Sequence, residues 1–95
     1  MFVGICRVEL GLHDNFSLKG KRSVVRRLIT RCRNRFNLAM NEVENLDSLT
    51  SAVLGFTVLG NSHAFVNSCI DKIVNFIERE AEGTLEHYSF EIENY

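Results

Sequence analysis

This sequence of 95 residues lacks the features that divide a chain into parts or direct it to a membrane. It contains no proline, no internal repeat and no low-complexity tract, so nothing in it reads as a linker. No apolar run approaches the roughly 20 residues that a membrane-spanning helix needs. Hydrophobic residues make up 45% of the chain and charged residues 24%, as in ordinary globular proteins. We therefore expect residues 1–95 to form one small domain.

Cysteine is scarce, and its spacing argues against the usual cysteine-based sites. The three residues, Cys6, Cys32 and Cys69, are odd in number, far apart and nowhere arranged as CxxC. This pattern does not fit a disulfide framework, and it provides too few thiols for a zinc site. We expect three buried thiols that act as small hydrophobic side chains, in a protein of the reducing cytoplasm.

The sequence also lacks motifs that indicate catalysis. It has no GxGxxG, no P-loop and no HExxH pattern. His13, His63 and His87 are far apart in the chain, and none has a carboxylate or a cysteine at motif spacing. Such isolated histidines are typical of surface or hydrogen-bonded positions rather than of catalytic or metal sites. We predict that the protein is not an enzyme and that it holds no metal or cofactor.

Positive charge is what the sequence has in excess, and it lies in one segment, residues 17–36. The segment SLKGKRSVVRRLITRCRNRF contains eight of the eleven Lys and Arg residues and no acidic residue, whereas the formal net charge of the whole chain is -1. Its apolar residues recur at helical spacing, which predicts an amphipathic helix with Ser17 as N-cap and an end near Phe36.

The remaining segments alternate between strand and helix patterns, and Gly83 is expected to cap the end of a second helix. In residues 38–46 the apolar positions shift, which indicates a bulge or an early end of the strand. The predicted elements are strands at 2–12, 38–46, 51–60 and 84–93, and helices at 17–36 and 61–82. This βαββαβ order predicts an α+β, ferredoxin-like fold, with a four-stranded antiparallel sheet and both helices on one face.

The basic helix predicts an anionic partner or an internal source of negative charge. Within the helix no cation has an acidic residue three or four positions away, so neutralisation must come from outside it. One source is the chain itself, at Glu42, Glu44, Asp47 or the acidic C-terminal segment, residues 78–95. The other is a phosphate backbone, and we favour structured RNA or the ribosome as partner. The predicted contact residues are Lys19, Lys21, Arg22, Arg26, Arg27, Arg31 and Arg33, of which Arg22, Arg26 and Arg33 share one side of the helix.

The sheet face without helices supports an alternative function. RNA-recognition domains of this topology stack bases on aromatic side chains there, but the outward positions of the first and third strands contain no aromatic residue. They form an apolar patch instead, and such a patch often marks an interface. The alternative is a homo-oligomeric or protein-interaction module, for example a homodimer, that uses this face or the edge strands. The predicted interface residues are Val3, Ile5, Val53 and Leu59.

Two motifs in the chain resemble those of the YlxP-like family of small bacterial proteins. Residues 4–10 follow a G-x-x-R-V-E-L pattern, and residues 17–23 follow S-L-K-x-K-R-S. The resemblance implies a ferredoxin-like fold and no catalytic residue. Because genes of this family often lie among genes for translation and ribosome maturation, it also implies an association with RNA. Gly20 departs from the family pattern, which commonly has Glu at that position.

Overall fold

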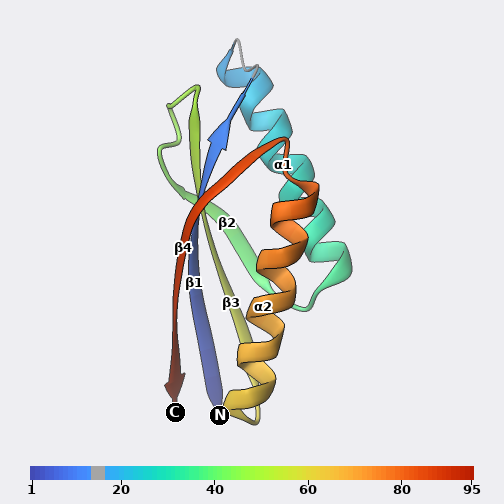
Figure 1. The fold of residues 1–95 in the computed structure, drawn as a ribbon, viewed down its shortest axis with the longest axis vertical. Coiled ribbons are helices and arrows are strands. Elements are labelled where there is room, and N and C mark those ends of the chain that lie inside the picture. The colour runs from blue at the N-terminus through green and yellow to red at the C-terminus, as the bar shows by residue number, and fades with distance from the viewer. Residues whose placement is uncertain (14–16) are drawn as a thin grey trace.

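A computed structural model describes residues 1–13 and 17–95, and its elements follow the predicted βαββαβ order (Figure 1). The strands are β1 (Phe2–Leu12), β2 (Ala39–Glu44), β3 (Ser51–Gly60) and β4 (Gly83–Asn94). The helices are α1 (Leu18–Arg35) and α2 (His63–Glu80). β2 is shorter than predicted.

The four strands form one antiparallel sheet in the order β2-β3-β1-β4, so that β1 and β3 are central. Both helices cover the same face of this sheet, and the opposite face carries no helix (Figure 1). α2 packs on β1 and β3, whereas α1 packs beside it over β2. The predicted ferredoxin-like α+β fold is therefore confirmed. Neither helix combines the length and the apolar character that a membrane crossing needs.

The core lies between the sheet and the helices, because alternate side chains of each strand point into that layer. Gly4 on β1 allows α2 to approach closely, since a Cβ atom there would lie 2.7 Å from both Ile70 and Val66. The core cluster includes buried residues of both central strands and of α2, among them Val8, Leu10, Leu54, Phe56, Ile70, Ile73 and Ile77.

The helix starts match the predicted capping, but one helix end does not. The Ser17 hydroxyl accepts a hydrogen bond from the Gly20 N–H (3.0 Å), and Ser62 caps α2 in the same way. Gly83 does not cap α2, because no glycine among the described residues has a positive φ. It begins β4 instead, where a Cβ atom would collide with the carbonyl oxygen of Gly11. The glycine is needed for the close approach of β1 and β4.

β2 contains the predicted bulge, and the bulge shapes the surroundings of α1. The register with β3 shifts between Glu42 and Glu44. Glu42 pairs with Leu54 and therefore shares the face of the sheet that α1 covers. Asn45 follows at the end of the strand with a φ of 59°, in the left-handed region that asparagine tolerates.

Candidate anion-binding surface of the basic helix

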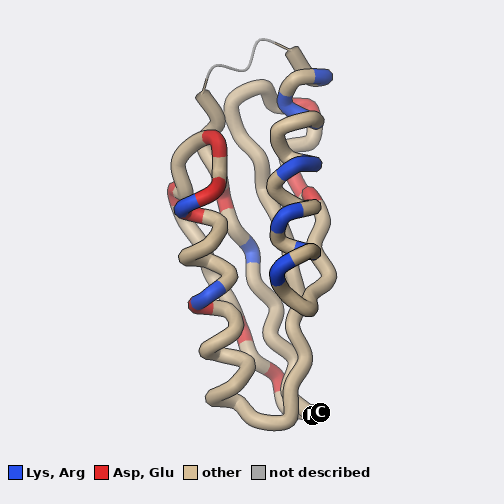
Figure 2. Tube along the Cα trace, turned by 90° about the vertical axis from the view of Figure 1, so that its right-hand side faces the viewer, with Lys and Arg blue, Asp and Glu red and all other residues tan. Residues whose placement is uncertain are grey.

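The cations of α1 lie on successive turns along its whole length (Figure 2). They do not share one environment, because the helix is packed against the sheet on one side and has β2 and α2 on either flank. Its side chains therefore divide into a buried set, a set that faces α2 and a set that faces β2.

Lys21 points into the protein, contrary to the prediction that it belongs to an exposed surface. Its side chain is 0% exposed, and its ammonium nitrogen lies 2.9 Å from a carboxylate oxygen of Glu42. The same ammonium donates a hydrogen bond to the backbone carbonyl of Asn45. The physical reason is the bulged strand, which brings a carboxylate and a carbonyl beneath the first turns of α1. Lys21 is therefore a structural residue and is not available to a partner.

Arg27 and Arg31 face the C-terminal end of α2 and are neutralised there. The Arg27 guanidinium lies 2.8 Å from the Glu82 carboxylate and also donates to the Ser23 hydroxyl at 2.9 Å. The Arg31 guanidinium lies 3.6 Å from the Glu80 carboxylate. The acidic C-terminal segment is thus one of the internal sources of negative charge that the sequence predicts.

Arg22, Arg26 and Arg33 lie together on the β2 side of α1, as their helical spacing predicts. With Thr30 and Asn41 they line a hollow of about 230 Å³ whose floor contains apolar residues of α1. Lys19 joins Arg22 and Arg26 around an adjoining hollow near the start of the helix. We call the surface formed by Lys19, Arg22, Arg26 and Arg33 the basic groove.

Carboxylates neutralise the basic groove only weakly. Arg22 reaches Asp47 at 3.9 Å, and both of these side chains are exposed. Arg33 donates to the backbone carbonyl of Met40 at 2.6 Å, which fixes its position without cancelling its charge. In the part of the chain that the structure describes, Lys19 and Arg26 have no ion pair.

Glu42 also lines the hollow, and its negative charge would oppose an anion there. Its carboxylate is the partner of the buried Lys21, however, so the two charges compensate each other. The net field of the basic groove is therefore set by its four surface cations.

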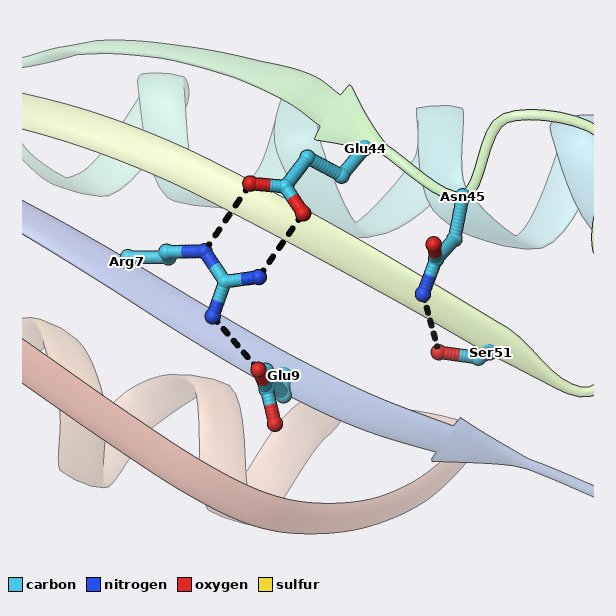
Figure 3. A network of polar contacts seen from close by, with 5 residues as sticks. All are labelled: Arg7, Glu9, Glu44, Asn45 and Ser51. Carbon is cyan, nitrogen blue, oxygen red and sulfur yellow. Dashed lines mark hydrogen bonds and ion pairs between the residues drawn. The ribbon is translucent and has the colours of Figure 1, made fainter.

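The helix-free face of the sheet is organised by Arg7 (Figure 3). Its guanidinium reaches across β3 and donates to both carboxylate oxygens of Glu44, at 3.2 and 2.9 Å. A further N–H donates to Glu9 on the same strand. These hydrogen bonds raise the pKa of Arg7, and the bond from Arg7 holds the pKa of Glu44 below its usual value.

The Arg7 network changes the predicted interface on this face. Val53 lies in the row between Glu9 and Glu44 and is only 1% exposed, because the Arg7 side chain spans that row. Val53 is therefore not part of an exposed patch. Ile5 and Leu59 are 49% and 61% exposed, and Leu59 lies opposite Val3 in the register. The apolar patch consists of these three residues.

The thiols and histidines form no site in the described residues. Cys6 and Cys32 are buried, and burial raises the pKa of each thiol to about 11. Cys69 is partly exposed rather than buried as expected, and all three thiols are free. Across residues 1–13 and 17–95, no group of three or more His, Cys, Asp or Glu residues is placed to hold a metal ion.

Comparisons with known proteins agree with the resemblance seen in the sequence. The protein "Uncharacterized protein YlxP" of Bacillus subtilis (strain 168) is 28% identical over 85 residues, which cover 87% of this chain and 92% of that protein. The de novo designed protein Ferredog-Diesel aligns with a TM-score of 0.47 and 9% identity, over 99% of this chain and 85% of its own. A dimeric ferredoxin-like protein from an uncultured marine organism aligns with a TM-score of 0.41 and 11% identity, over 97% and 94%.

A protein family with the description "Protein of unknown function (DUF503)" matches residues 3–90, which include both motifs noted in the sequence. This match covers nearly the whole chain and both motif segments. The chain therefore belongs to the DUF503 family.

Proposed function

We propose that this protein binds the phosphate backbone of structured RNA through the basic groove, without catalysing a reaction. The observation that carries the proposal is the unequal neutralisation of α1. Its α2 side has carboxylates at 2.8 and 3.6 Å, whereas the four cations of the basic groove have, among the described residues, a single carboxylate contact, at 3.9 Å. An anion bound in the groove would relieve the repulsion among these like charges.

The dimensions of the groove fit a backbone contact. Lys19 and Arg33 are fourteen residues apart on the helix, which corresponds to about 21 Å along its axis. A track of this length can contact several successive phosphates, and guanidinium groups match phosphate oxygens with paired hydrogen bonds. Among the described residues, no aromatic side chain lines the groove, so none of them offers a platform for base stacking there. Contacts of this kind fix position and carry little sequence information.

The experiment is a salt series of RNA binding, with ribosomal RNA fragments as the probe. Four phosphate contacts predict that log affinity falls with log salt concentration at a slope of about -3 to -4. Arg26→Gln removes one contact and is expected to reduce the slope by about one, while the circular dichroism spectrum remains that of the wild type. Absence of salt-dependent binding by the wild type at modest ionic strength would falsify the proposal.

Self-association through the helix-free face is a second candidate function. The observation that favours it is the patch of Val3, Ile5 and Leu59, of which two side chains are about half or more exposed on a face that no helix covers. Burial of such a patch is a common reason for dimerisation. Sedimentation equilibrium of the wild type and of Ile5→Asp tests this candidate. It predicts a dimer that the substitution converts to a monomer, and a wild type that stays monomeric at high concentration contradicts it.

A further inference from the structure

A second cluster of cations lies where the end of α1 meets the middle and end of α2, and it shares no residue with the basic groove. Arg35, Lys72 and Arg79, with Phe36 and Asn75, line a hollow of about 200 Å³. Lys72, Asn75 and Arg79 belong to α2, where they are spaced at i, i+3 and i+7 and therefore share one helix face. Arg35 reaches the hollow from the last turn of α1.

In the part of the chain that the structure describes, no carboxylate forms an ion pair with this cluster, that is, with Arg35, Lys72 or Arg79. Within α2, the positions three and four residues from Lys72 hold no acidic residue. Arg31 and Arg27, which lie four and eight residues before Arg35 on α1, differ because Glu80 and Glu82 pair with them. The cluster therefore concentrates three positive charges that remain available to a ligand.

An aromatic ring holds the two guanidinium groups in place. The guanidinium carbons of Arg35 and Arg79 lie 5.3 and 5.7 Å from the centroid of the Phe76 ring. The Phe36 ring meets Phe76 edge to face at 5.4 Å, so the platform itself is packed. Contact with a ring orients a guanidinium without using any of its N–H donors. Both arginines thus keep their hydrogen-bonding edges free.

We propose that this cluster is a binding site for a phosphate monoester. Two arginines can each offer paired N–H donors to phosphate oxygens, and the Lys72 ammonium and the Asn75 amide supply further donors. A monoester carries nearly two negative charges at neutral pH, so it compensates three cations better than the single charge of a phosphodiester. The hollow is smaller than the roughly 300 Å³ at which pockets for larger ligands begin, which fits a compact anionic group. We call it the monoester site.

The first test is an NMR titration with inorganic phosphate at constant ionic strength, followed at the arginine Nε–H and Asn75 side-chain signals. The wild type is expected to show saturable shifts confined to the monoester site. Arg35→Gln with Arg79→Gln is expected to weaken binding about tenfold or more, because two charge-assisted contacts are lost. Lys72→Gln, which leaves the ring contacts intact, is expected to weaken binding without any change in fold. Unchanged phosphate affinity in both variants overturns the proposal.

The double variant Arg35→Lys, Arg79→Lys distinguishes the effect of charge on phosphate binding from the effect of guanidinium geometry. This variant keeps all three charges but loses the planar donors, so the proposal predicts weaker phosphate binding than in the wild type. Wild-type affinity in this variant would show a diffuse field rather than a built site. Small, non-saturating shifts spread equally over the basic groove and the cluster would show the same.

The source of the phosphate is distinguished with RNA oligonucleotides that end in a 5′-phosphate or a 5′-hydroxyl. Tighter binding of the 5′-phosphorylated form, lost in Arg35→Gln with Arg79→Gln, identifies an RNA end as the ligand. Equal binding of both forms, with a saturable phosphate titration, identifies a small phosphate ester. The Arg22→Gln, Arg26→Gln variant of the basic groove must retain inorganic phosphate binding. The proposal of a monoester site can thus be confirmed or refuted independently of the proposed RNA binding by the basic groove.

Discussion

The two flanks of α1 carry similar residues and differ in what the rest of the chain places beside them. On the α2 flank, Arg27 and Arg31 meet Glu82 and Glu80. On the β2 flank, the one carboxylate contact of the basic groove within the described residues is that of Arg22 with Asp47, at 3.9 Å. The comparison shows that the field of a basic helix depends on the acidic residues that the fold brings to each flank.

The topology explains why the flanks differ. The fold places the end of α2 beside α1, and this brings Glu80, the last residue of α2, and Glu82, just after it, to the arginines of α1. β2 also brings a carboxylate to α1, because strand alternation places Glu42 on the helix side, where the buried Lys21 pairs with it, while the bulge turns Glu44 to the opposite face. The β2 flank is therefore left positive although an acidic residue is nearby.

The largest expected effect is a loss of stability on substitution of Lys21, which is buried and structural, unlike the exposed cations of α1. Lys21→Met leaves Glu42 without its partner, and removing one member of a buried ion pair costs about 3 kcal/mol of unfolding free energy. The double variant Lys21→Met, Glu42→Leu is expected to recover most of this loss, because a matched apolar pair replaces a matched ionic one. Urea denaturation of both variants measures the difference. Equal loss in the single and double variants would show that the pair is not coupled.

Stability is expected to depend on pH through the helix-free face, where Arg7 forms solvent-exposed ion pairs with Glu9 and Glu44. Because the pKa of Glu44 is lowered in the folded protein, the ionised carboxylate stabilises the fold. This stabilisation is fully present above the unfolded pKa, near 4.5, and is lost as pH falls through the folded pKa. The stability difference between wild type and Glu44→Gln should therefore shrink on acidification. Denaturant midpoints between neutral and acid pH measure it, and a difference independent of pH would contradict the assignment.

The smallest expected changes in stability are those caused by substituting one arginine on each flank of α1. Arg27→Gln removes an exposed ion pair and is expected to lower stability by at most about 1 kcal/mol. Arg26→Gln relieves repulsion and is expected to leave stability unchanged or raise it by a few tenths of a kcal/mol. Thermal melts at low and high salt measure both values. The opposite sign of the two effects, or identical values at low salt, would argue against the division of α1 into two flanks.

The fold was predictable because strand alternation and helical spacing are local properties of the sequence. The burial of Lys21 could also have been predicted. It lies four residues before Val25 and seven before Leu28, inside the apolar stripe of α1. Charged side chains are seldom fully buried, so the signal for burial is its position in the stripe and not its residue type. The exposed members of the basic groove followed correctly from the same spacing.

Features that depend on register and on helix pairing could not be predicted from the sequence. Burial of Val53 requires Arg7 to reach Glu44 across β3, and that contact depends on where the bulge in β2 falls. The monoester site combines residues of two helices whose relative shift the sequence does not encode locally. The ring contacts of Arg35 and Arg79 with Phe76 therefore appear only in the folded protein.

The family motifs gain a physical meaning that is mostly structural. Gly4 permits the approach of α2, Arg7 and Glu9 belong to the network on the helix-free face, and Ser17 caps α1. Lys21 holds the bulged strand to the helix. Of the charged residues in the S-L-K-x-K-R-S motif, only Lys19 and Arg22 remain for a partner.

The most direct test of the central claim compares RNA binding by two double variants with equal loss of charge. Arg22→Gln, Arg26→Gln alters the β2 flank, and Arg27→Gln, Arg31→Gln alters the α2 flank. Each removes two positive charges from α1, so a nonspecific effect of net charge is matched. The first variant is expected to lose about tenfold or more in RNA affinity and the second less than about threefold. Equal losses in the two variants would contradict it.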